Sequence, residues 1–174
     1  MLMQRIMRTL HPLWLTLLLL TAGPGAQAQA LQAREVAPAV WFVQGETALG
    51  SSANRNFISN AGFILTPAGV VVIDGLGSPA LAEELLAAIR RVSSLPIHSV
   101  VVTHYHADHV YGLQALKAAG ARILAHPAAR EYLNSDTAQQ RLVASREELA
   151  PWVNEQTRLV PADEWLAADE TELN

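Results

Sequence analysis

The sequence predicts an α/β layered fold, and three observations lead to this prediction. The run VVVID, residues 70–74, is a stretch of apolar residues that ends in a carboxylate, which is typical of a strand buried on both faces. An amphipathic helical pattern follows over residues 78–94, and the segment IHSVVVTH, residues 97–104, returns to β character. A strand, a helix and a strand in this order favour parallel strands joined by a right-handed crossover.

The helix over residues 78–94 has the clearest pattern of any element. Its apolar positions follow the i, i+4, i+7, i+8 spacing of a helix with one buried face; they are Leu81, Leu85, Ala88, Ile89 and Val92. Ser78 is a suitable N-cap and Pro79 suits the first helical position. Arg90 and Arg91 lie in the last turn, where cations interact favourably with the helix dipole.

The other elements are expected in order along the chain. The β-rich runs VAPAVWFVQG and FISNAGFILT come before residue 70, and the second ends at the turn Pro67-Ala68-Gly69. Beyond residue 104, VYGLQALKAAG predicts a helix that stops at Gly120, and ARILAHP predicts another strand. Two helical segments, AAREYLNS and TAQQRLVASREELAPWV, precede a polar tail, RLVPADEWLAADETELN.

The first thirty residues have the three-part pattern of a secretory signal peptide. Arg5 and Arg8 precede the apolar run LWLTLLLLTAG, which is followed by AQAQA. The run is shorter than the roughly 20 apolar residues that a membrane-spanning helix needs, so no stable membrane span is expected after cleavage. Cleavage is expected after Ala28 or Ala30, which leaves a single domain over residues 31–174 and a secreted or periplasmic protein.

Composition restricts the chemistry that the domain can perform. The 174 residues carry a formal net charge of −4 and contain no cysteine. Loss of residues 1–30 removes two arginines and no acid, which leaves 10 basic and 16 acidic residues, a charge of −6. A chain this acidic is a poor binder of nucleic acid, so a small-molecule substrate is the expected partner. Without thiolates, a metal ion would have to be held by imidazole and carboxylate.

The stretch THYHADHVYG, residues 103–112, predicts a metal site. It places His104, His106, Asp108 and His109 within six residues. His104 and His106 are two residues apart at the end of a predicted strand, so both imidazoles can reach one ion, and Asp108 and His109 follow closely enough to serve that ion or a second one. The carboxyl end of a strand in an open α/β sheet is also where such folds bind ligands.

Imidazole and carboxylate ligands suit Zn²⁺, and also iron or manganese, and zinc is our first choice. A catalytic zinc lowers the pKa of its bound water from 15.7 to about 7, which provides a hydroxide nucleophile at neutral pH. Asp108 is the expected catalytic carboxylate, because it can orient that water or receive its proton.

The motif HYHADH, preceded by VVVT and by VVVID about thirty residues earlier, resembles the metallo-β-lactamase superfamily, whose signature is His-x-His-x-Asp-His. Within it, NFISNAGFILTPAGVVVIDGLGSPALAEELLAAIR and THYHADHVYGLQALKAAGARILAHPAAREYL look like the quinoprotein relay system zinc metallohydrolases, which are exported. The resemblance implies a four-layer αββα sandwich with two zinc ions. It implies that His104 and His106 bind the first zinc, that Asp108 and His109 belong to the second, and that Asp74 supports the metal loop through hydrogen bonds.

The sequence departs from the family pattern downstream of this motif. The family needs a further histidine, a bridging aspartate and a last histidine, whereas His126 is the only later histidine and lies at a predicted strand end where it does not match. Leu159, Val160, Trp165 and Leu166 are apolar residues of the tail with no later element to cover them. We therefore expect a truncated fold, its N-terminal half, with half of a binuclear site that binds metal weakly.

The resulting functional hypothesis is an exported zinc metallohydrolase that cleaves an ester, thioester, lactone or β-lactam bond. One alternative is an iron-dependent oxidoreductase or sulfur dioxygenase of the same fold, because ligand type alone does not fix the metal. Another is a non-catalytic accessory protein of an exported redox system, and the subgroup resemblance suggests a link to quinoproteins. The loop over residues 46–56 either flanks the active-site groove or is a plain connection between two strands.

Overall fold

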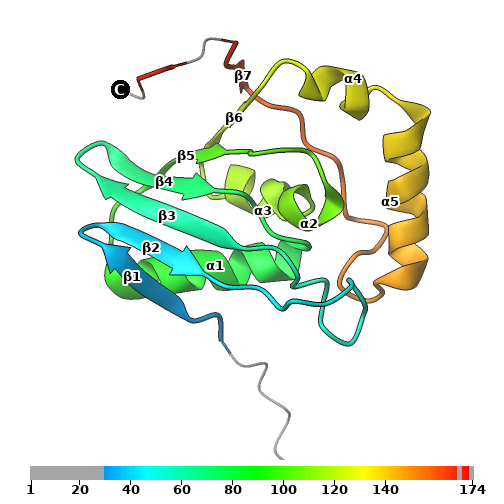
Figure 1. The fold of residues 1–174 in the computed structure, drawn as a ribbon, viewed down its shortest axis with the longest axis horizontal. Coiled ribbons are helices and arrows are strands. Elements are labelled where there is room, and N and C mark those ends of the chain that lie inside the picture. The colour runs from blue at the N-terminus through cyan, green and yellow to red at the C-terminus, as the bar shows by residue number, and fades with distance from the viewer. Residues whose placement is uncertain (1–29, 168–169, 173–174) are drawn as a thin grey trace, which may run out of the picture.

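A computed structural model describes residues 30–167 and 170–172 of the chain, so almost all of the predicted signal peptide lies outside the described residues. The described residues form one mixed sheet with helices (Figure 1). Its elements are β1 (Ala33–Ala37), β2 (Val40–Val43), β3 (Ala61–Thr66), β4 (Gly69–Ile73), α1 (Pro79–Val92), β5 (Ile97–Val101), α2 (Ala107–Val110), α3 (Leu113–Ala118), β6 (Arg122–Ala125), α4 (Ala129–Leu133), α5 (Asp136–Glu148) and β7 (Glu164–Trp165).

The seven strands lie side by side in the order in which they occur in the sequence. β1 to β4 pair antiparallel, with short turns between β1 and β2 and between β3 and β4 and a long loop, residues 44–60, between β2 and β3, whereas β4 to β7 pair parallel through helical crossovers. The four central apolar residues Phe63, Val72, Val100 and Ile123 are cross-strand partners in adjacent strands, and all four are fully buried. The predicted α/β class and the parallel crossover are therefore confirmed.

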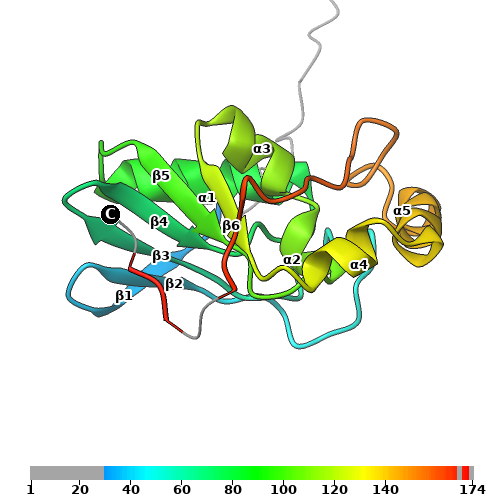
Figure 2. The same ribbon diagram turned by 90° about the horizontal axis from the view of Figure 1, so that it is seen from above.

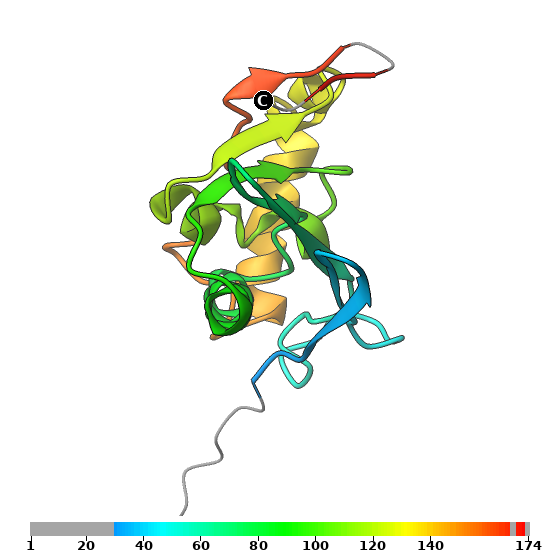
Figure 3. The ribbon, with the colours of Figure 1, turned by 90° about the vertical axis from the view of Figure 1, so that its left-hand side faces the viewer.

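The helices divide into two groups around this sheet. α1 and α3 lie on one face, and no helix of the described residues lies on the opposite face (Figures 2 and 3). α4 and α5 lie beyond the end of the sheet at which β4 and β5 finish (Figure 2). One sheet and one helical layer correspond to half of the four-layer sandwich that the resemblance implies. No helix in the described part of the chain has both the length and the apolar character to cross a bilayer.

Helix α1 forms as its sequence predicts. The side chain of Ser78 accepts a hydrogen bond from the Leu81 amide at 3.3 Å, Pro79 begins the helix, and the apolar face is buried under the sheet. Arg91, in the last turn, donates to the carbonyl of Leu31 at 2.7 Å. Leu31 is itself buried, so this contact ties the start of the described chain to the core.

The helix predicted over residues 110–120 forms only over Leu113–Ala118, as α3, and Tyr111 and Gly112 separate it from a second short helix, α2, that ends at Val110. Gly112 donates its amide hydrogen to the carbonyl of Leu76, and a Cβ at Gly112 would lie 1.9 Å from the carbonyl oxygen of Gly75. The backbone of the β4–α1 loop therefore packs directly onto the α2–α3 junction, where only glycine fits. The pattern of apolar residues could not reveal this break, because the cause is a contact with a distant segment.

The polar tail, to which the sequence analysis assigned no element, contains a short strand. Residues 164 and 165 pair with β6 as β7, so the parallel edge of the sheet is extended by a short strand. Asp163 prepares this pairing: its amide donates to the carbonyl of Ile123 at 2.8 Å, and its carboxylate accepts from the amide of Ile123 at 2.9 Å and from Lys117. Val160 is buried, so part of the apolar surface of the tail is covered within the chain.

Replacement of Asp163 by asparagine should destabilise the β7 edge in a pH-dependent way. The hydrogen bond from Lys117 and that from the Ile123 amide lower the pKa of Asp163 from its ordinary 3.8, so its contribution is complete above about pH 4 and is lost as the pH falls through the lowered value. We expect Asp163→Asn to reduce the free energy of unfolding by about 1 kcal/mol at pH 7.

Urea unfolding at pH 7, 5 and 3 measures this effect, because only the last value lies below the ordinary pKa of an aspartate. The difference between Asp163→Asn and wild type should shrink at the lowest pH, and a difference independent of pH would contradict the ionic contribution of Asp163. Glu164→Gln is the control, because Glu164 is half exposed and its pairing with Arg122 at 3.5 Å is expected to contribute little.

Candidate metal centre

The predicted metal motif forms the loop that leaves the carboxyl end of β5 and enters α2. Tyr105 anchors this loop, because its ring is buried and its hydroxyl donates to the carbonyl of Val160 at 3.1 Å. Burial raises the pKa of Tyr105 to about 12, so the hydroxyl stays protonated. His104 and His106, on either side of Tyr105, are exposed. The extended backbone thus directs one residue into the core and its two neighbours towards solvent.

The structure brings the four predicted ligands together. The ring centroid of His104 lies 4.5 Å from that of His106 and 4.1 Å from that of His109. The Nε2 atom of His109 lies 3.4 Å from a carboxylate oxygen of Asp108. Three imidazoles and one carboxylate therefore share one small region at the end of the parallel strands, as the strand-end position of the motif predicts.

The buried side chain of Asp74 links the residues of this region through hydrogen bonds. Asp74 follows β4, has a left-handed backbone with φ of 63°, and is only 3% exposed. Its carboxylate accepts three hydrogen bonds: from the Thr103 amide at 2.9 Å, from the Thr103 hydroxyl at 2.7 Å and from Nδ1 of His109 at 2.8 Å. The loop support that the resemblance assigns to Asp74 therefore has a direct structural basis, and one of these bonds reaches a predicted ligand itself.

These hydrogen bonds determine where two imidazoles carry their protons. His109 must present Nδ1–H to the carboxylate of Asp74, which leaves its Nε2 as a free acceptor. The Thr103 hydroxyl donates its one hydrogen to Asp74. Its oxygen must therefore accept the hydrogen bond from Nδ1 of His104, at 3.0 Å. His104 is thereby also left with a free Nε2. Both rings are held in the tautomer that a metal-binding histidine uses when its other nitrogen is hydrogen-bonded.

Electrostatics distinguish the two rings. Partial burial lowers the pKa of His104, and the two neighbouring imidazoles act in the same direction. Burial also acts to lower the pKa of His109, but the hydrogen bond to Asp74 and the charges of Asp74 and Asp108 outweigh it and raise the pKa. His104 is therefore held neutral, as a metal ligand must be, whereas His109 attracts positive charge.

The donor set fits a divalent metal ion of the zinc class. Free imidazole nitrogens are borderline ligands for zinc, and Asp108 adds a hard oxygen. Nε2 of His109 and the carboxylate of Asp108 are two acceptors that face each other, so a cation or a proton must compensate them. As they stand, no three His, Asp or Glu side chains among the described residues are arranged to hold an ion. The assignment of His104, His106, Asp108 and His109 as ligands stays a prediction.

Two residues that support the loop had no role in the sequence prediction. Thr103 lies within the quoted motif, but its bridge between Asp74 and His104 depends on a segment about thirty residues away. Ser59, at the end of the β2–β3 loop, is buried and donates its hydroxyl to the carbonyl of Asp108. A single serine or threonine carries no recognisable sequence signal for such a contact. Asp74 was found only because it ends an apolar strand and matches a family position.

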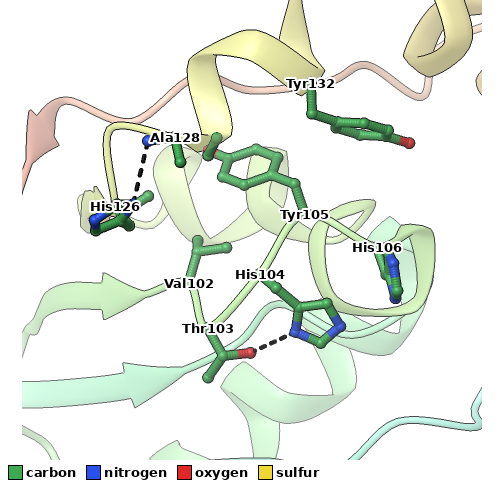
Figure 4. Close-up of a pocket in the computed structure, with 10 residues that line it drawn as sticks. Val102, Thr103, His104, Tyr105, His106, His126, Ala128 and Tyr132 are labelled. Carbon is green, nitrogen blue, oxygen red and sulfur yellow. Dashed lines mark hydrogen bonds between the residues drawn. The ribbon is translucent and has the colours of Figure 1, made fainter.

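His126 lies at one end of a cavity of about 440 Å³ that His104 and His106 also line. Figure 4 shows His126 on the opposite side of this cavity from His106, with Val102 and Tyr105 between them. Its Nδ1 accepts a hydrogen bond from the amide of Ala128 at 3.2 Å. This placement gives His126 no contact with the predicted ligands, in keeping with its mismatch to the family pattern.

Comparison with known proteins identifies the family. The sequence model of the metallo-beta-lactamase superfamily matches residues 54–171, which is more than half of the chain and includes every predicted ligand. The chain belongs to the metallo-beta-lactamase superfamily. Among solved structures, a metallo-beta-lactamase from Pontibacter korlensis superposes with a TM-score of 0.55 at 20% identity over 83% of this chain and 56% of that one, which shows a shared fold.

Curated relatives within the superfamily match over shorter stretches. The linear primary-alkylsulfatase of Pseudomonas sp. (strain ATCC 19151) is 36% identical over 52 residues, 30% of this chain and 10% of that protein. The metallo-beta-lactamase type 2 of Bacillus cereus is 31% identical over 83 residues, 48% of this chain and 31% of that protein. The chain thus spans less than a third of the length of either relative.

Replacement of Asp74 by asparagine should disturb both the tautomers and the metal affinity of this loop. The amide group carries no charge, and its nitrogen cannot accept the hydrogen bonds made by the carboxylate oxygen that it replaces. Since Asp74 raises the pKa of His109, we expect Asp74→Asn to lower that pKa, measured by NMR titration of the ring protons. Zinc affinity, measured by competition with a chromophoric chelator, should fall by about 10- to 100-fold.

Asp136→Asn is the matched control, because Asp136 is an exposed aspartate in the first turn of α5 and is not part of the loop. It should leave both quantities unchanged. Equal zinc affinity in Asp74→Asn and wild type would contradict the positioning role of Asp74.

Proposed function

We propose that the protein containing this chain is an exported zinc-dependent hydrolase that cleaves an ester, thioester, lactone or β-lactam bond. The observation that carries this proposal is the linked set of hydrogen bonds through Asp74, which leaves Nε2 free on both His104 and His109, the latter 3.4 Å from Asp108. A structural histidine cluster has no need of two rings that each keep a free nitrogen. The names of the curated relatives, a sulfatase and a lactamase, support hydrolysis as the reaction class.

Each residue of the loop has a part in this proposal. His104, His106 and His109 would hold the metal through imidazole nitrogens, with Asp108 as the carboxylate ligand. Zinc, when bound, supplies Lewis acidity and acidifies a water molecule. The side chain of Asp108 is 22% exposed, so it can also orient a water or accept its proton. Asp74 is nearly inaccessible and acts through Thr103 and His109.

Zinc titration of the purified chain tests the metal. We expect weak binding, because the described residues supply fewer than the three arranged ligands of a usual catalytic zinc site. His106→Gln should weaken binding further, whereas His126→Gln should not. Elemental analysis of protein made without added metal distinguishes the iron alternative, and bound iron in place of zinc would overturn the zinc assignment. Two tightly bound equivalents would contradict the expected half-site.

Hydrolysis is tested with zinc supplied, on a chromogenic cephalosporin and on p-nitrophenyl esters. We expect slow turnover above the uncatalysed rate for at least one of these compounds, and its loss in His104→Gln and His106→Gln. No turnover at saturating zinc would refute hydrolysis by this chain and favour the accessory role. A link to an exported quinoprotein redox system stays a prediction.

Export is proposed from the N-terminal sequence, and the structure of the following residues supports it. Leu31, which follows the second predicted cleavage site directly, is the first of the described residues that is buried in the core. Cleavage after Ala28 or Ala30 would therefore leave the folded domain intact. We expect the protein recovered from the periplasm or medium of an expressing bacterium to begin at residue 29 or 31, determined by N-terminal sequencing. An uncleaved Met1 in a membrane fraction would contradict export.

A further inference from the structure

A second cavity, of about 550 Å³, opens on the α5 side of the metal loop and is distinct from the one that His126 lines. Its lining residues come from three segments: His106 and Asp108 from the metal loop, Leu49 and Ile58 from the β2–β3 loop, and Thr137 and Arg141 from α5. Figure 1 shows α5 and the lower part of the β2–β3 loop on the same side of the fold. A volume of this size is typical of sites for small molecules.

Charge is distributed unevenly around this cavity. Arg141 is the one arginine or lysine among its lining residues, and Asp108 is the one carboxylate. Thr137 lies one helical turn before Arg141, so its hydroxyl lies on the same face of α5. Apolar residues such as Ile58 and Leu149 also line the cavity. The cavity therefore combines a carboxylate of the metal loop, apolar side chains and one cation from a different element, α5.

The guanidinium of Arg141 is available to a ligand. Its partner is Glu148 at 2.6 Å, and the two side chains are 45% and 52% exposed. An ion pair exposed to this degree is weak, because water screens it and two long side chains must be ordered to form it. A ligand carboxylate, held in the cavity by its other contacts, can replace Glu148 and accept both hydrogen bonds of the planar fork.

We propose that Arg141, assisted by Thr137, binds a carboxylate at the far end of the substrate, whose scissile bond lies at the His106 and Asp108 end. The substrate class is then a monoanionic ester, thioester or lactam whose carboxylate is separated from the scissile carbonyl by a short apolar spacer. This proposal rests on the proposed hydrolysis. A single cation favours one negative charge over a dianionic phosphate, which would leave one charge uncompensated.

A matched pair of esters tests this preference: the mono-p-nitrophenyl ester of adipic acid, whose carboxylate is too far from the ester to attack it readily, and the p-nitrophenyl ester of hexanoic acid, which is neutral. The quantity measured is the ratio of kcat/KM for the two esters with zinc supplied, each corrected for hydrolysis without protein. Arg141→Gln should lower the ratio about tenfold, with the loss confined to the adipate ester. Arg141→Lys should retain part of the preference, and Glu148→Gln should preserve or raise it by removing the competing carboxylate.

Arg122→Gln is the matched control, since Arg122 is a similarly exposed arginine paired with Glu164 at the β6 edge. It should leave the ratio unchanged. An equal effect of Arg141→Gln on both esters, or an effect of Arg122→Gln as large as that of Arg141→Gln, would overturn the proposal.

Binding tests the inference separately from turnover. Monomethyl succinate added to the full chain should shift the NMR signal of the Arg141 side-chain Nε–H in a saturable way, and Arg141→Gln should abolish the saturable shifts around the cavity. Turnover of neither ester together with saturable binding would reject the proposed hydrolysis but keep the anion site. The absence of saturable binding in the wild type would reject the anion site.

Discussion

The carboxylate of Asp74 is the constraint on which the metal loop depends. A carboxylate with 3% exposure must have its oxygens satisfied by donors, because an unpaired buried charge is very costly. The donors available are the amide and hydroxyl of Thr103 and Nδ1 of His109, so burial of one side chain fixes three groups on another segment. Through the Thr103 hydroxyl the same carboxylate orders His104 as well. A single buried acid thereby sets two tautomers.

The backbone around Asp74 is adapted to bring these groups together. Asp74 and Leu76 both have left-handed φ of 63°, a conformation that is costly for Leu76 and is retained because the surrounding packing determines it. Gly75 donates its amide to the carbonyl of His109 at 2.7 Å, and its own carbonyl lies against Gly112. Two strand-end loops thus pack backbone to backbone. The strained backbone of the β4–α1 loop is thus part of a rigid support for the metal loop.

The sequence was sufficient for features that depend on local pattern. The cap at Ser78, the buried strand that ends at Asp74 and the clustering of His104 and its neighbours all follow from spacing and residue type. It was insufficient for features that depend on contacts between segments far apart in the sequence. The helix break at Gly112 depends on contact with the β4–α1 loop. The β7 strand depends on the carboxylate of Asp163, which accepts a hydrogen bond from the Ile123 amide of β6 as a strand carbonyl would. A complete set of metal ligands could not be predicted for the same reason, because ligands that come from separate segments show no fixed spacing in the sequence.

Asp108 and Arg141, which carry opposite charges, both line the cavity beside α5. The cavity can therefore orient a charged substrate, which a metal site alone does not do. An ion held by imidazoles attracts any electron-rich group, including a substrate carboxylate that should not react. A cation at the far wall competes for that carboxylate and leaves the neutral carbonyl to the metal end. Because α5 follows β6 and is not part of the metal loop, its sequence can change without disturbing the hydrogen bonds of Asp74. Under the proposed function, one element positions the metal while another selects the substrate, which is how one fold supports many substrates.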